Sequence, residues 1–395
     1  MLNIFLICAF VICSFLIVYH HAIYPLFLSW YSKRHPESPV VIRSRGYRDQ
    51  AQDNQRPSIT IVVPAYNEER WIADKIRNLA TLDYPTNRLK VIIACDGCTD
   101  QTAEIAQATI QEAACCETLF EIHVHRKNRG KVALLNHHMQ YIDSDITGLS
   151  DVSALISIDA LIIAEEHFKT ERTGVVNSSY QVLDSANQGE LDYWKYQSKI
   201  KQREATLGST LGAHGAFYLF RTRLFTPLKS NTINDDFVLP MQIVKQGFIA
   251  KHEERMVAVE MEATSCSNDF KRRLRISAGN MQQVIRLASM FKPKYKGVAF
   301  AFLSGKGLRL VTPYLMIGCL TISAVLATQP IFLAALLLQV VCYAIAIANT
   351  FIPAMSSIKL CQLIAYMITG HYANLIGGLR YLLGMESERW SRINQ

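Results

Sequence analysis

Hydrophobic and polar positions divide this chain into a polar middle and two apolar flanks. Residues 1–30, 310–358 and 360–379 contain no Asp, Glu, Lys or Arg. The region between these flanks has roughly the charge density of a soluble globular domain. The pattern therefore predicts a soluble body at residues 45–265, with membrane segments on both sides of it.

The apolar flanks predict helices in or at a membrane. Residues 2–18 are one apolar run of nearly spanning length, so we expect a transmembrane or interfacial helix over residues 1–30. Residues 310–351 predict a transmembrane hairpin. Residues 357–383 are more polar, and two interpretations stay open for them. They either span the membrane or lie in its interface or among neighbouring helices.

Basic residues beside the apolar flanks indicate orientation. Lys33 and Arg34 directly follow the first flank, and the positive-inside rule then places the central body in the cytoplasm, at a plasma (inner) membrane. A cleaved signal peptide is the alternative for residues 1–30, but that segment lacks a basic start and a small-residue cleavage pattern. The basic run at residues 271–275 predicts amphipathic interface helices over residues 266–309.

Strand and helix patterns alternate through the first half of the central body. Continuous apolar or β-branched runs predict buried parallel strands, and a 3.6-residue period predicts the helices between them. The expected strands are residues 58–63, 89–95 and 120–124 with a fourth that ends near residue 149, and the expected helices are residues 68–79, 99–109 and 131–142. This alternation predicts an α/β fold with a mostly parallel sheet.

Four acidic motifs follow one another along this body. They are PAYNEE at residues 64–69, CDGCTD at 95–100, LSDVS at 149–153 and INDDF at 233–237. The first three lie where predicted strands end, and ligands of parallel sheets bind at such ends. Each motif alone is also explained by an ordinary helix start, which favours Asn, Asp and Glu. Neither a G-x-G-x-x-G nor a P-loop motif follows the first strand, which argues against those two nucleotide sites.

Composition excludes some other functions. The formal net charge is +8, but the densest basic run lies beside a membrane flank, which argues against nucleic-acid binding. The ten cysteines are scattered, and cytoplasmic placement predicts free thiols. Cys95 and Cys98 form a C-x-x-C pair, but no second pair lies at metal-binding spacing.

Six motifs in order resemble those of the family 2 inverting glycosyltransferases, which have the GT-A fold. They are PSITIVVPAYNEE, VIIACDGCTDQT, NRGKVALLNHHM, LSDVS, the segment from YWKYQ to GAFYLFR, and INDDFVLPMQIVKQGF. The resemblance covers residues 57–291, and within the family it is to membrane-bound polysaccharide and N-acetylglucosaminyl-type synthases. It implies a GT-A nucleotide-sugar-binding domain with N- and C-terminal transmembrane helices.

The resemblance implies roles on the donor side of the site. Glu68 and Asp96 match residues that contact the nucleotide, and Lys131 matches one that lines its pocket. Asp151 matches the first carboxylate of the metal-binding motif and implies Mg²⁺ or Mn²⁺, which prefer hard oxygen ligands. Ser153 stands where the second carboxylate usually lies, so diphosphate and water oxygens are expected to complete the coordination.

The resemblance also implies roles on the acceptor side. Asp236 matches the catalytic base, and Asp235 matches its acidic partner. A base is needed because an acceptor hydroxyl has a high pKa, and a like-charged neighbour raises the pKa of the basic carboxylate. His214 and Gly215 match the loop under the acceptor, although a packing role is an equal alternative for His214. A single displacement would convert an α-linked donor into a β-glycoside.

One motif departs from the processive members of the family, which carry Gln-x-x-Arg-Trp. The corresponding residues 272–276 read RRLRI. Arg275 keeps the position that supports the diphosphate. Ile276 replaces the tryptophan on which an acceptor sugar would stack, and this argues against polymerisation of long chains.

We therefore expect an integral membrane glycosyltransferase. It would move a sugar, with N-acetylglucosamine or glucose as candidates, from a UDP-sugar to a lipid-linked or saccharide acceptor in cell-surface polysaccharide or glycolipid synthesis. A processive polysaccharide synthase with an export or synthase partner subunit is one alternative. A non-catalytic scaffold that binds a nucleotide sugar is another; Ser153 and Ile276 favour it, and the retained Asp151 and Asp236 oppose it.

Overall fold

The computed structural model describes residues 1–36, 40–183, 188–262, 266–352, 355 and 358–385, without the side chains of 188–195 and 266–269. The chain divides into two compact units. His35–Ser265 form the sheet unit, and Met1–Arg34 with Cys266–Glu386 form the helical unit. The boundaries that we expected at residues 265 and 357 lie outside the described residues.

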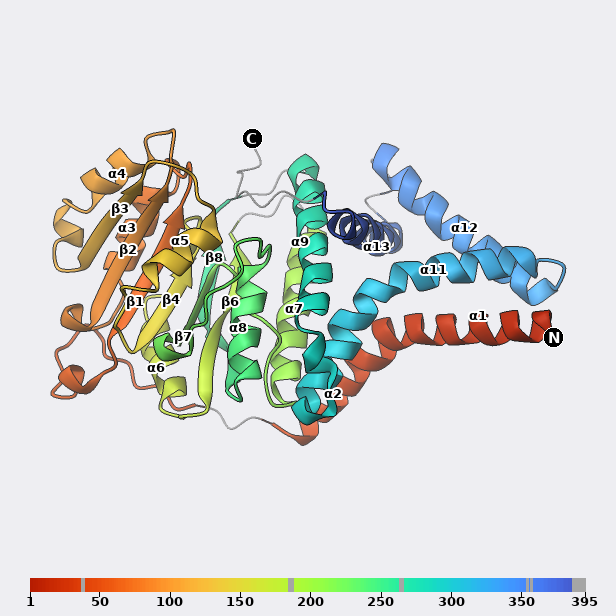
Figure 1. The fold of residues 1–395 in the computed structure, drawn as a ribbon, viewed down its shortest axis with the longest axis horizontal. Helices are drawn as coiled ribbons and strands as arrows, with labels where there is room; N and C mark the ends of the chain where they lie inside the picture. Colours follow the sequence, from red (N-terminus) through yellow and green to blue (C-terminus); the bar gives the residue numbers. More distant parts are fainter. Residues whose placement is uncertain (37–39, 184–187, 263–265, 353–354, 356–357, 386–395) are drawn as a thin grey trace. The chain divides into compact units, whose positions relative to one another are not determined.

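An eight-stranded mixed sheet is the centre of the sheet unit, in the order β3-β2-β1-β4-β7-β6-β8-β5 (Figure 1). The strands are β1 (Ile59–Ala65), β2 (Leu89–Asp96), β3 (Leu119–His125), β4 (Ile146–Ser150), β5 (Ala154–Ile156), β6 (Thr173–Val182), β7 (Phe217–Arg221) and β8 (Ile249–Glu260). β1 pairs in parallel with β2 and β4, and β2 pairs in parallel with β3. β7 is antiparallel to β4 and β6, β8 is parallel to β6, and β5 is antiparallel to β8.

The predicted strands form the parallel half of this sheet. Every residue of β1 is buried, and in β2 only Lys90 is partly exposed, as the continuous apolar runs predicted. Ile72, Ile76 and Leu79 pack into the same core from one face of the following helix. Burial of a large apolar side chain stabilises a fold by about 1.5–3 kcal/mol, so this shared face holds helix and sheet together.

The helices of this half are α3 (Ile72–Ala80), α4 (Thr102–Thr109), α5 (Lys131–His138) and α6 (Ala160–Phe168). α3 and α4 begin a few residues later than predicted, because the residues before them bond across the two loops instead. Asn67 Nδ2 donates to Thr99 Oγ1 at 3.1 Å, and the backbone N–H of Glu68 donates to Thr102 Oγ1 at 2.7 Å. The loops after β1 and β2 thereby hold each other in place.

The second half of the sheet unit carries α7 (Gln188–Ala205) and α8 (Asp235–Lys245), which both contact β6 and β8. Short 3-10 turns of the chain lie at Asp53–Gln55, Thr86–Arg88, Ala113–Cys115, Thr222–Leu224, Ala288–Phe291 and Pro293–Tyr295. In this second half of the sheet unit, the sequence pattern had indicated only a helix that starts at INDDF. The antiparallel pairings of β7 are therefore what the structure adds to the predicted α/β fold.

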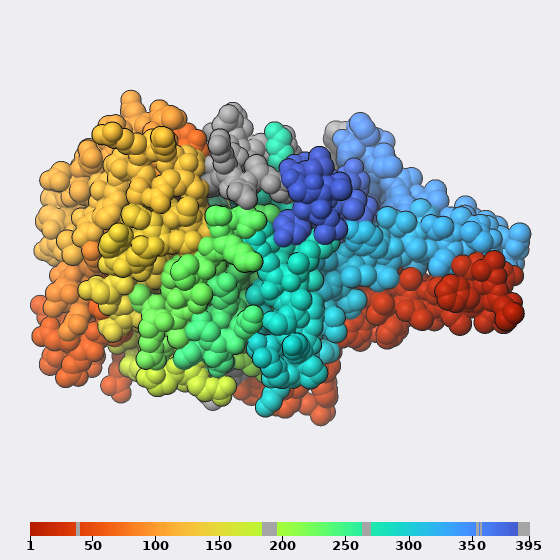
Figure 2. Space-filling model, in the orientation of Figure 1, coloured from red at the N-terminus to blue at the C-terminus, as the bar shows by residue number. Residues whose placement is uncertain are grey.

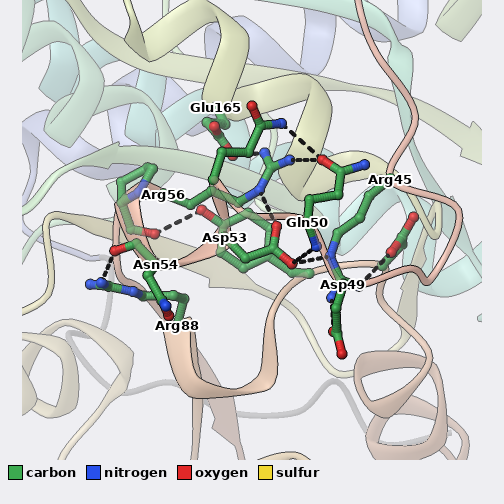
Figure 3. Close-up of polar contacts among 12 residues, drawn as sticks. Arg45, Asp49, Gln50, Asp53, Asn54, Arg56, Arg88 and Glu165 are labelled. Carbon is green, nitrogen blue, oxygen red and sulfur yellow. Dashed lines mark hydrogen bonds and ion pairs between the residues drawn. The ribbon is translucent and has the colours of Figure 1, made fainter.

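A buried network of ion pairs fastens the segment before β1 to the rest of the sheet unit (Figure 3). Arg45 contacts Asp53 at 3.1 Å and Asp83 at 3.0 Å. Arg56 contacts Asp53 at 2.9 Å and Glu165 of α6 at 2.7 Å. Both guanidinium groups are buried and bonded to more than one carboxylate, which is what a buried charge requires. We call this network the arginine clasp.

The helical unit contains α1 (Leu2–Val18), α2 (Tyr24–Arg34), α9 (Cys266–Arg286), α10 (Gly297–Ala301), α11 (Leu308–Val325), α12 (Pro330–Phe351) and α13 (Lys359–Leu382). Two π-helical turns, Tyr19–Ile23 and Phe302–Gly307, interrupt the helices. Among the described residues, three stretches are long and apolar enough to cross a membrane, namely Leu2–Arg34, Gly297–Val325 and Pro330–Phe351. The predicted apolar helices at both ends are thus confirmed. Figure 2 shows α1 (red) lying along α11 (light blue).

α13 is the segment for which two interpretations were open. Among the described helices it does not reach the apolarity of a membrane-spanning stretch. His371, Asn374 and Gly377 on it are buried. A Cβ on Gly377 would lie 2.6 Å from the Leu274 carbonyl oxygen, so α13 packs closely against α9. These observations favour a helix that lies among its neighbours.

Candidate active site

Asp96 ends β2, and its carboxylate is fully buried. It accepts hydrogen bonds from the backbone N–H groups of Arg129 at 3.0 Å and Gly130 at 2.8 Å. Gly97 has a φ of +67°, and a Cβ there would lie 2.3 Å from the Asn128 backbone nitrogen, so only glycine allows the two loops to approach. Asp96 therefore positions the loop that leads into α5. Its predicted contact with the nucleotide stays a prediction.

Glu68 lies in the loop after β1 and is partly buried. Asn67 before it has a φ of 54°, a left-handed conformation that Asn adopts more readily than most residues. The bonds from this loop to Thr99 and Thr102 hold Glu68 at the sheet edge where Asp96 also lies. The strand ends therefore bring Glu68 and Asp96 to one edge, as the alternation predicted.

Lys131 is the first residue of α5 and links two of the acidic motifs. Its Nζ donates to Asp151 Oδ1 at 2.8 Å and lies 3.6 Å from Asp235 Oδ2. Burial opposes its charge, but the carboxylates of Asp151, Asp235 and Asp236 outweigh burial and raise the pKa of Lys131. Lys131 is therefore a stable cation between Asp151, the predicted metal ligand, and Asp235, the acidic partner of the predicted base.

Asp235 and Asp236 are the first two residues of α8, as the helix-start pattern of INDDF predicted. The backbone N–H of Ala213 donates to the Asp236 carbonyl at 2.8 Å, which joins the loop around His214 to this helix start. Burial and the adjacent charge of Asp235 raise the pKa of Asp236, while Lys131 and Lys201 act in the opposite direction. A carboxylate whose pKa is raised in this way is suited to accept a proton.

Gly215 separates the two key carboxylates. A Cβ built on it would lie 2.9 Å from Asp151 Oδ2 and 3.7 Å from Asp236 Oδ2. Lys131 bonds to Oδ1 of Asp151. The other oxygen, Oδ2, borders the space that is left because Gly215 has no side chain. No three His, Cys, Asp or Glu side chains form a complete metal site within the described part of the chain. Asp151 Oδ2 therefore supplies one carboxylate oxygen at this position, and a cation bound to it stays a prediction.

His214 lies in the same loop and packs against an aromatic ring. Its imidazole stacks on Tyr180 with ring centroids 3.8 Å apart. Its Nδ1 accepts the backbone N–H of Ala216 at 3.2 Å, so a neutral His214 carries its proton on Nε2. The packing role that was left open is therefore present, and a contact with the acceptor stays a prediction.

Sequence reasoning missed Lys75, which bonds to residues on both sides of Asp151. Lys75 is fully buried on α3, and its Nζ donates to Ser150 Oγ at 2.6 Å and to the Ala154 carbonyl. Ser150 directly precedes Asp151 within LSDVS and Ala154 directly follows the motif, so Lys75 fixes the chain on both sides of Asp151. Burial lowers the pKa of Lys75 to about 7. A signal existed in the sequence, because Lys75 shares a helix face with Ile72, Ile76 and Leu79.

Lys201 and Tyr218 were also missed. Lys201 of α7 donates from Nζ to the Ala213 carbonyl at 3.1 Å, and burial lowers its pKa against the pull of Asp236. Tyr218 of β7 is fully buried; burial raises its pKa well above its usual value, and the charges of Asp235 and Asp236 add to this. Its Oη has no hydrogen-bond partner among the described residues. Both residues lie in the segment from YWKYQ to GAFYLFR, but its pattern did not single them out, because only the fold brings α7 and β7 to α8.

Arg275 belongs to the helical unit, where it is an exposed residue of α9. The eight other predicted site residues belong to the sheet unit. Its predicted contact with the diphosphate therefore stays a prediction. Its neighbour on the same helix, Arg273, lies over the ring of Tyr366 at 4.5 Å, which fastens α9 to α13.

Known proteins resemble this chain in both sequence and fold. Over 236 residues it is 24% identical to the poly-β-1,6-N-acetyl-D-glucosamine synthase of Staphylococcus aureus (strain COL), covering 58% of this chain and 56% of that protein. The enzyme of the same name from Staphylococcus epidermidis is 22% identical over 244 residues, covering 60% and 58%. The alignments thus span little more than half the length of these relatives.

A solved structure has the same overall fold. It is a mannosyltransferase from Pyrobaculum calidifontis in complex with GDP-Man and Mn²⁺, and it matches 96% of this chain and 100% of its own with a TM-score of 0.70 at 20% identity. The predicted GT-A architecture with apolar terminal helices is therefore confirmed. Residues 57–279, more than half of the chain, match the family model described as glycosyltransferase like family 2. Family model, sequence relatives and fold agree that this chain is a member of glycosyltransferase family 2.

Proposed function

We propose that this protein transfers a sugar from a UDP-sugar to a membrane-associated acceptor, with inversion at the anomeric carbon. The observation that carries the proposal is the convergence of Lys131, Asp151 and Asp236 around Gly215. The names of the sequence relatives support N-acetylglucosamine as the first sugar to test. The GDP-Man bound to the structural relative makes GDP-sugars the second donor class.

The donor side of the proposed site is built on the strand ends. In this proposal Glu68 and Asp96 bind the nucleotide at the ends of β1 and β2, and Lys131 and Arg275 offset the diphosphate charge. The fixed position of the β1 and β2 loops supports this, because a site that is held in place before binding loses less entropy when the donor enters.

Asp151 is proposed to hold Mg²⁺ or Mn²⁺, with the donor diphosphate as the main source of further oxygen ligands. Such a cation would supply positive charge against the charge that develops on the departing diphosphate. Lys75 is proposed to keep Asp151 in position through Ser150 and Ala154. Asp151 Oδ1 would keep its bond to Lys131, so that both cations share one carboxylate.

Asp236 is proposed as the base. Its carboxylate takes the proton of the acceptor hydroxyl while that oxygen forms a bond to C1 of the sugar. The bond between C1 and the diphosphate oxygen breaks on the opposite face, and the nucleotide leaves with the electron pair. The raised pKa of Asp236, caused by burial and by Asp235, supports this role because it strengthens the carboxylate as a base. His214 and Gly215 are proposed to border the acceptor.

Processive synthesis is the second candidate function, since the sequence relatives are named as synthases of a polymer. Ile276 in place of tryptophan argues for short products, because it gives an acceptor sugar no aromatic surface to stack on. The two candidates differ in product length and share the same reaction. A non-catalytic scaffold would bind a nucleotide sugar without turnover.

The test is nucleotide release by the purified full chain in detergent, with Mn²⁺ or Mg²⁺, a panel of UDP- and GDP-sugars and membrane lipid extract as acceptor. We expect release from one donor, a loss of at least about a hundredfold in Asp236→Asn, and unchanged donor binding, since the change removes the base only. Asp143→Asn, which changes an exposed acid elsewhere in the sheet unit, is the matched control and is expected to keep full activity.

Product size then separates the two catalytic candidates, with single sugars or short chains expected. Donor binding without release by the parent protein, together with a normal cellular role for Asp236→Asn, would establish the scaffold instead. Full activity of Asp236→Asn would remove Asp236 as the base.

A further inference from the structure

Three histidines meet in the helical unit, within a region of mostly apolar helices. His21 Nε2 lies 3.0 Å from His371 Nε2, and the rings of His20 and His21 are 4.8 Å apart. His20 Nδ1 lies 2.9 Å from the Ser304 carbonyl oxygen. Arg309 is close enough to act electrostatically on all three imidazoles. We call these four residues the histidine cluster.

Both π-helical turns in the described part of the chain lie at this cluster. Tyr19–Ile23 contains two of its histidines, and Phe302–Gly307 contains Ser304. Tyr19 Oη and Ser304 Oγ are 3.0 Å apart, so the two turns are bonded to each other. Turns of this kind are rare and recur at functional sites, where they redirect side chains. The cluster is therefore held by distorted backbone on two helices.

The cluster has unused hydrogen-bonding capacity. A carbonyl oxygen only accepts, so His20 Nδ1 donates to Ser304. One of the two facing Nε2 atoms of His21 and His371 donates to the other. His371 is only 6% exposed, and its Nδ1 is buried without a partner among the described residues. A buried polar atom without a partner is costly unless a ligand or water completes it.

The charged residues of the helical unit indicate which kind of ligand the cluster would bind. Among residues 1–34 and 266–385 the sequence has fourteen Lys and Arg residues but a single acidic residue, Asp269. The positive charge of Arg309, which acts on all three imidazoles, disfavours a bound cation. An anion would accept hydrogen bonds from the imidazoles and from Arg309, and such charge-assisted bonds are the strong ones. The cluster is therefore suited to an anionic group.

The position of the histidine cluster along the membrane-spanning helices indicates where such an anion would come from. α1 has 17 residues, and at 1.5 Å per residue it spans about 25 Å, close to the thickness of a hydrocarbon core. If α1 crosses the hydrocarbon core along its whole length, residues 19–23 follow at the depth of lipid headgroups. Leu303 and Tyr372, which adjoin Ser304 and His371 in the chain, are 53% and 54% exposed. The surface of the helical unit thus comes within one residue of the cluster, although His371 Nδ1 itself is buried.

We propose that the histidine cluster binds the phosphate group of a membrane lipid. Arg309 supplies the charge. His371, in the tautomer whose Nε2 accepts from His21, donates from Nδ1 the hydrogen bond that the protein itself leaves open. The phosphate belongs either to a lipid monophosphate that serves as substrate or product, or to an anionic phospholipid of the bilayer. This site goes beyond the proposed sugar transfer, and its test needs no donor sugar.

The experiment titrates the purified full chain in a neutral detergent with farnesyl phosphate and counts bound lipid by native mass spectrometry. We expect one farnesyl phosphate per chain, and no binding of farnesol, which lacks the phosphate. His371→Phe keeps a ring but removes the open nitrogen, and Arg309→Gln removes the charge. Each is expected to weaken binding at least about tenfold, as the loss of a charge-assisted hydrogen bond predicts. Lys359→Gln, which removes an exposed charge at the start of α13, is the matched control and is expected to bind as the parent does.

Competition identifies the source. Displacement of farnesyl phosphate by short-chain phosphatidylglycerol at equal concentration would assign the site to bilayer phospholipid, and resistance to it would assign a lipid monophosphate. Thermal unfolding without ligand checks that each variant folds, and Arg309→Gln remains as the test if His371→Phe does not. Equal binding of farnesol and farnesyl phosphate, or parent-like binding by both cluster variants, would overturn the proposal.

Discussion

Gly215 borders both carboxylates of the site, so the smallest possible side chain there tests the geometry. The Cβ of Gly215→Ala would lie 2.9 Å from Asp151 Oδ2, and the flexible end of Asp151 would have to move. We expect normal folding, a higher Mn²⁺ requirement, and a drop in kcat/KM of about ten- to a hundredfold, since small displacements of a catalytic group have such effects.

Steady-state rates at varied Mn²⁺ measure this effect. Gly370→Ala is the matched control, because a Cβ there meets nothing within 4 Å. If Gly215→Ala keeps the parent's kcat/KM and metal requirement, Asp151 does not act where we place it.

Lys201 sets the pH dependence of the proposed base. Its positive charge lowers the pKa of Asp236 against the effect of burial, so Lys201→Met is expected to raise that pKa further. The base works only when deprotonated. The acid limb of the kcat/KM profile is therefore expected to move to higher pH, with the loss of activity beginning earlier as the pH falls.

The matched control for this change is Lys199→Met, an exposed lysine two residues away on α7, which is expected to leave the profile unchanged. An acid limb that stays in place in Lys201→Met while the rate falls uniformly would mean that Lys201 only supports the loop at Ala213.

At the scale of elements, the arginine clasp joins the segment before β1 to α6. Arg56→Met leaves the buried carboxylates of Asp53 and Glu165 with one cation fewer. Removing one partner of a buried ion pair destabilises a protein by about 3–5 kcal/mol, and we expect the lower end of this range because Asp53 keeps Arg45. The midpoint of thermal unfolding in detergent measures the change.

Arg77→Met is the comparison for the clasp, since it breaks an exposed pair with Glu112. Exposed pairs stabilise little, so its midpoint is expected to stay near that of the parent. Equal midpoints for the two variants would show that the clasp does not hold the unit together.

Some helices and strands could be predicted from their own sequence, and others could not. β1 and β2 were predictable because most of their positions are apolar or β-branched, as a strand buried on both faces requires. The late start of α3 was not, because the bonds of residues 67–69 go to a loop thirty residues further along. β7 was missed because its pairing with β4 and β6 depends on contacts remote in sequence.

At the scale of the whole molecule, the prediction concerns the side of the membrane on which the sheet unit lies. Lys33 and Arg34 predict that the sheet unit lies in the cytoplasm. On that prediction Cys116, an exposed thiol of the unit, is expected to escape a membrane-impermeant maleimide in intact cells. Labelling is expected after the membrane is disrupted and is expected to fall in Cys116→Ser.

Thr328→Cys at the turn between α11 and α12 serves as the positive control, because the far side of a transmembrane hairpin should react in intact cells. Labelling of Cys116 in intact cells would place the sheet unit outside. The measurement compares gel shifts of intact and lysed cells.

The sequence by itself determined the α/β order, the apolar terminal helices, the acidic motifs and the family. These follow from local periodicity and short motifs, in which each residue reports on its near neighbours. Only the tertiary structure decided that Lys131 lies between Asp151 and Asp235 and that His21 meets His371. It also decided that Lys75 and Lys201 bond to the backbone beside the site residues. Those contacts join residues far apart in the chain, so they exist only once the core and the helical unit have packed. Local pattern carries no information about them.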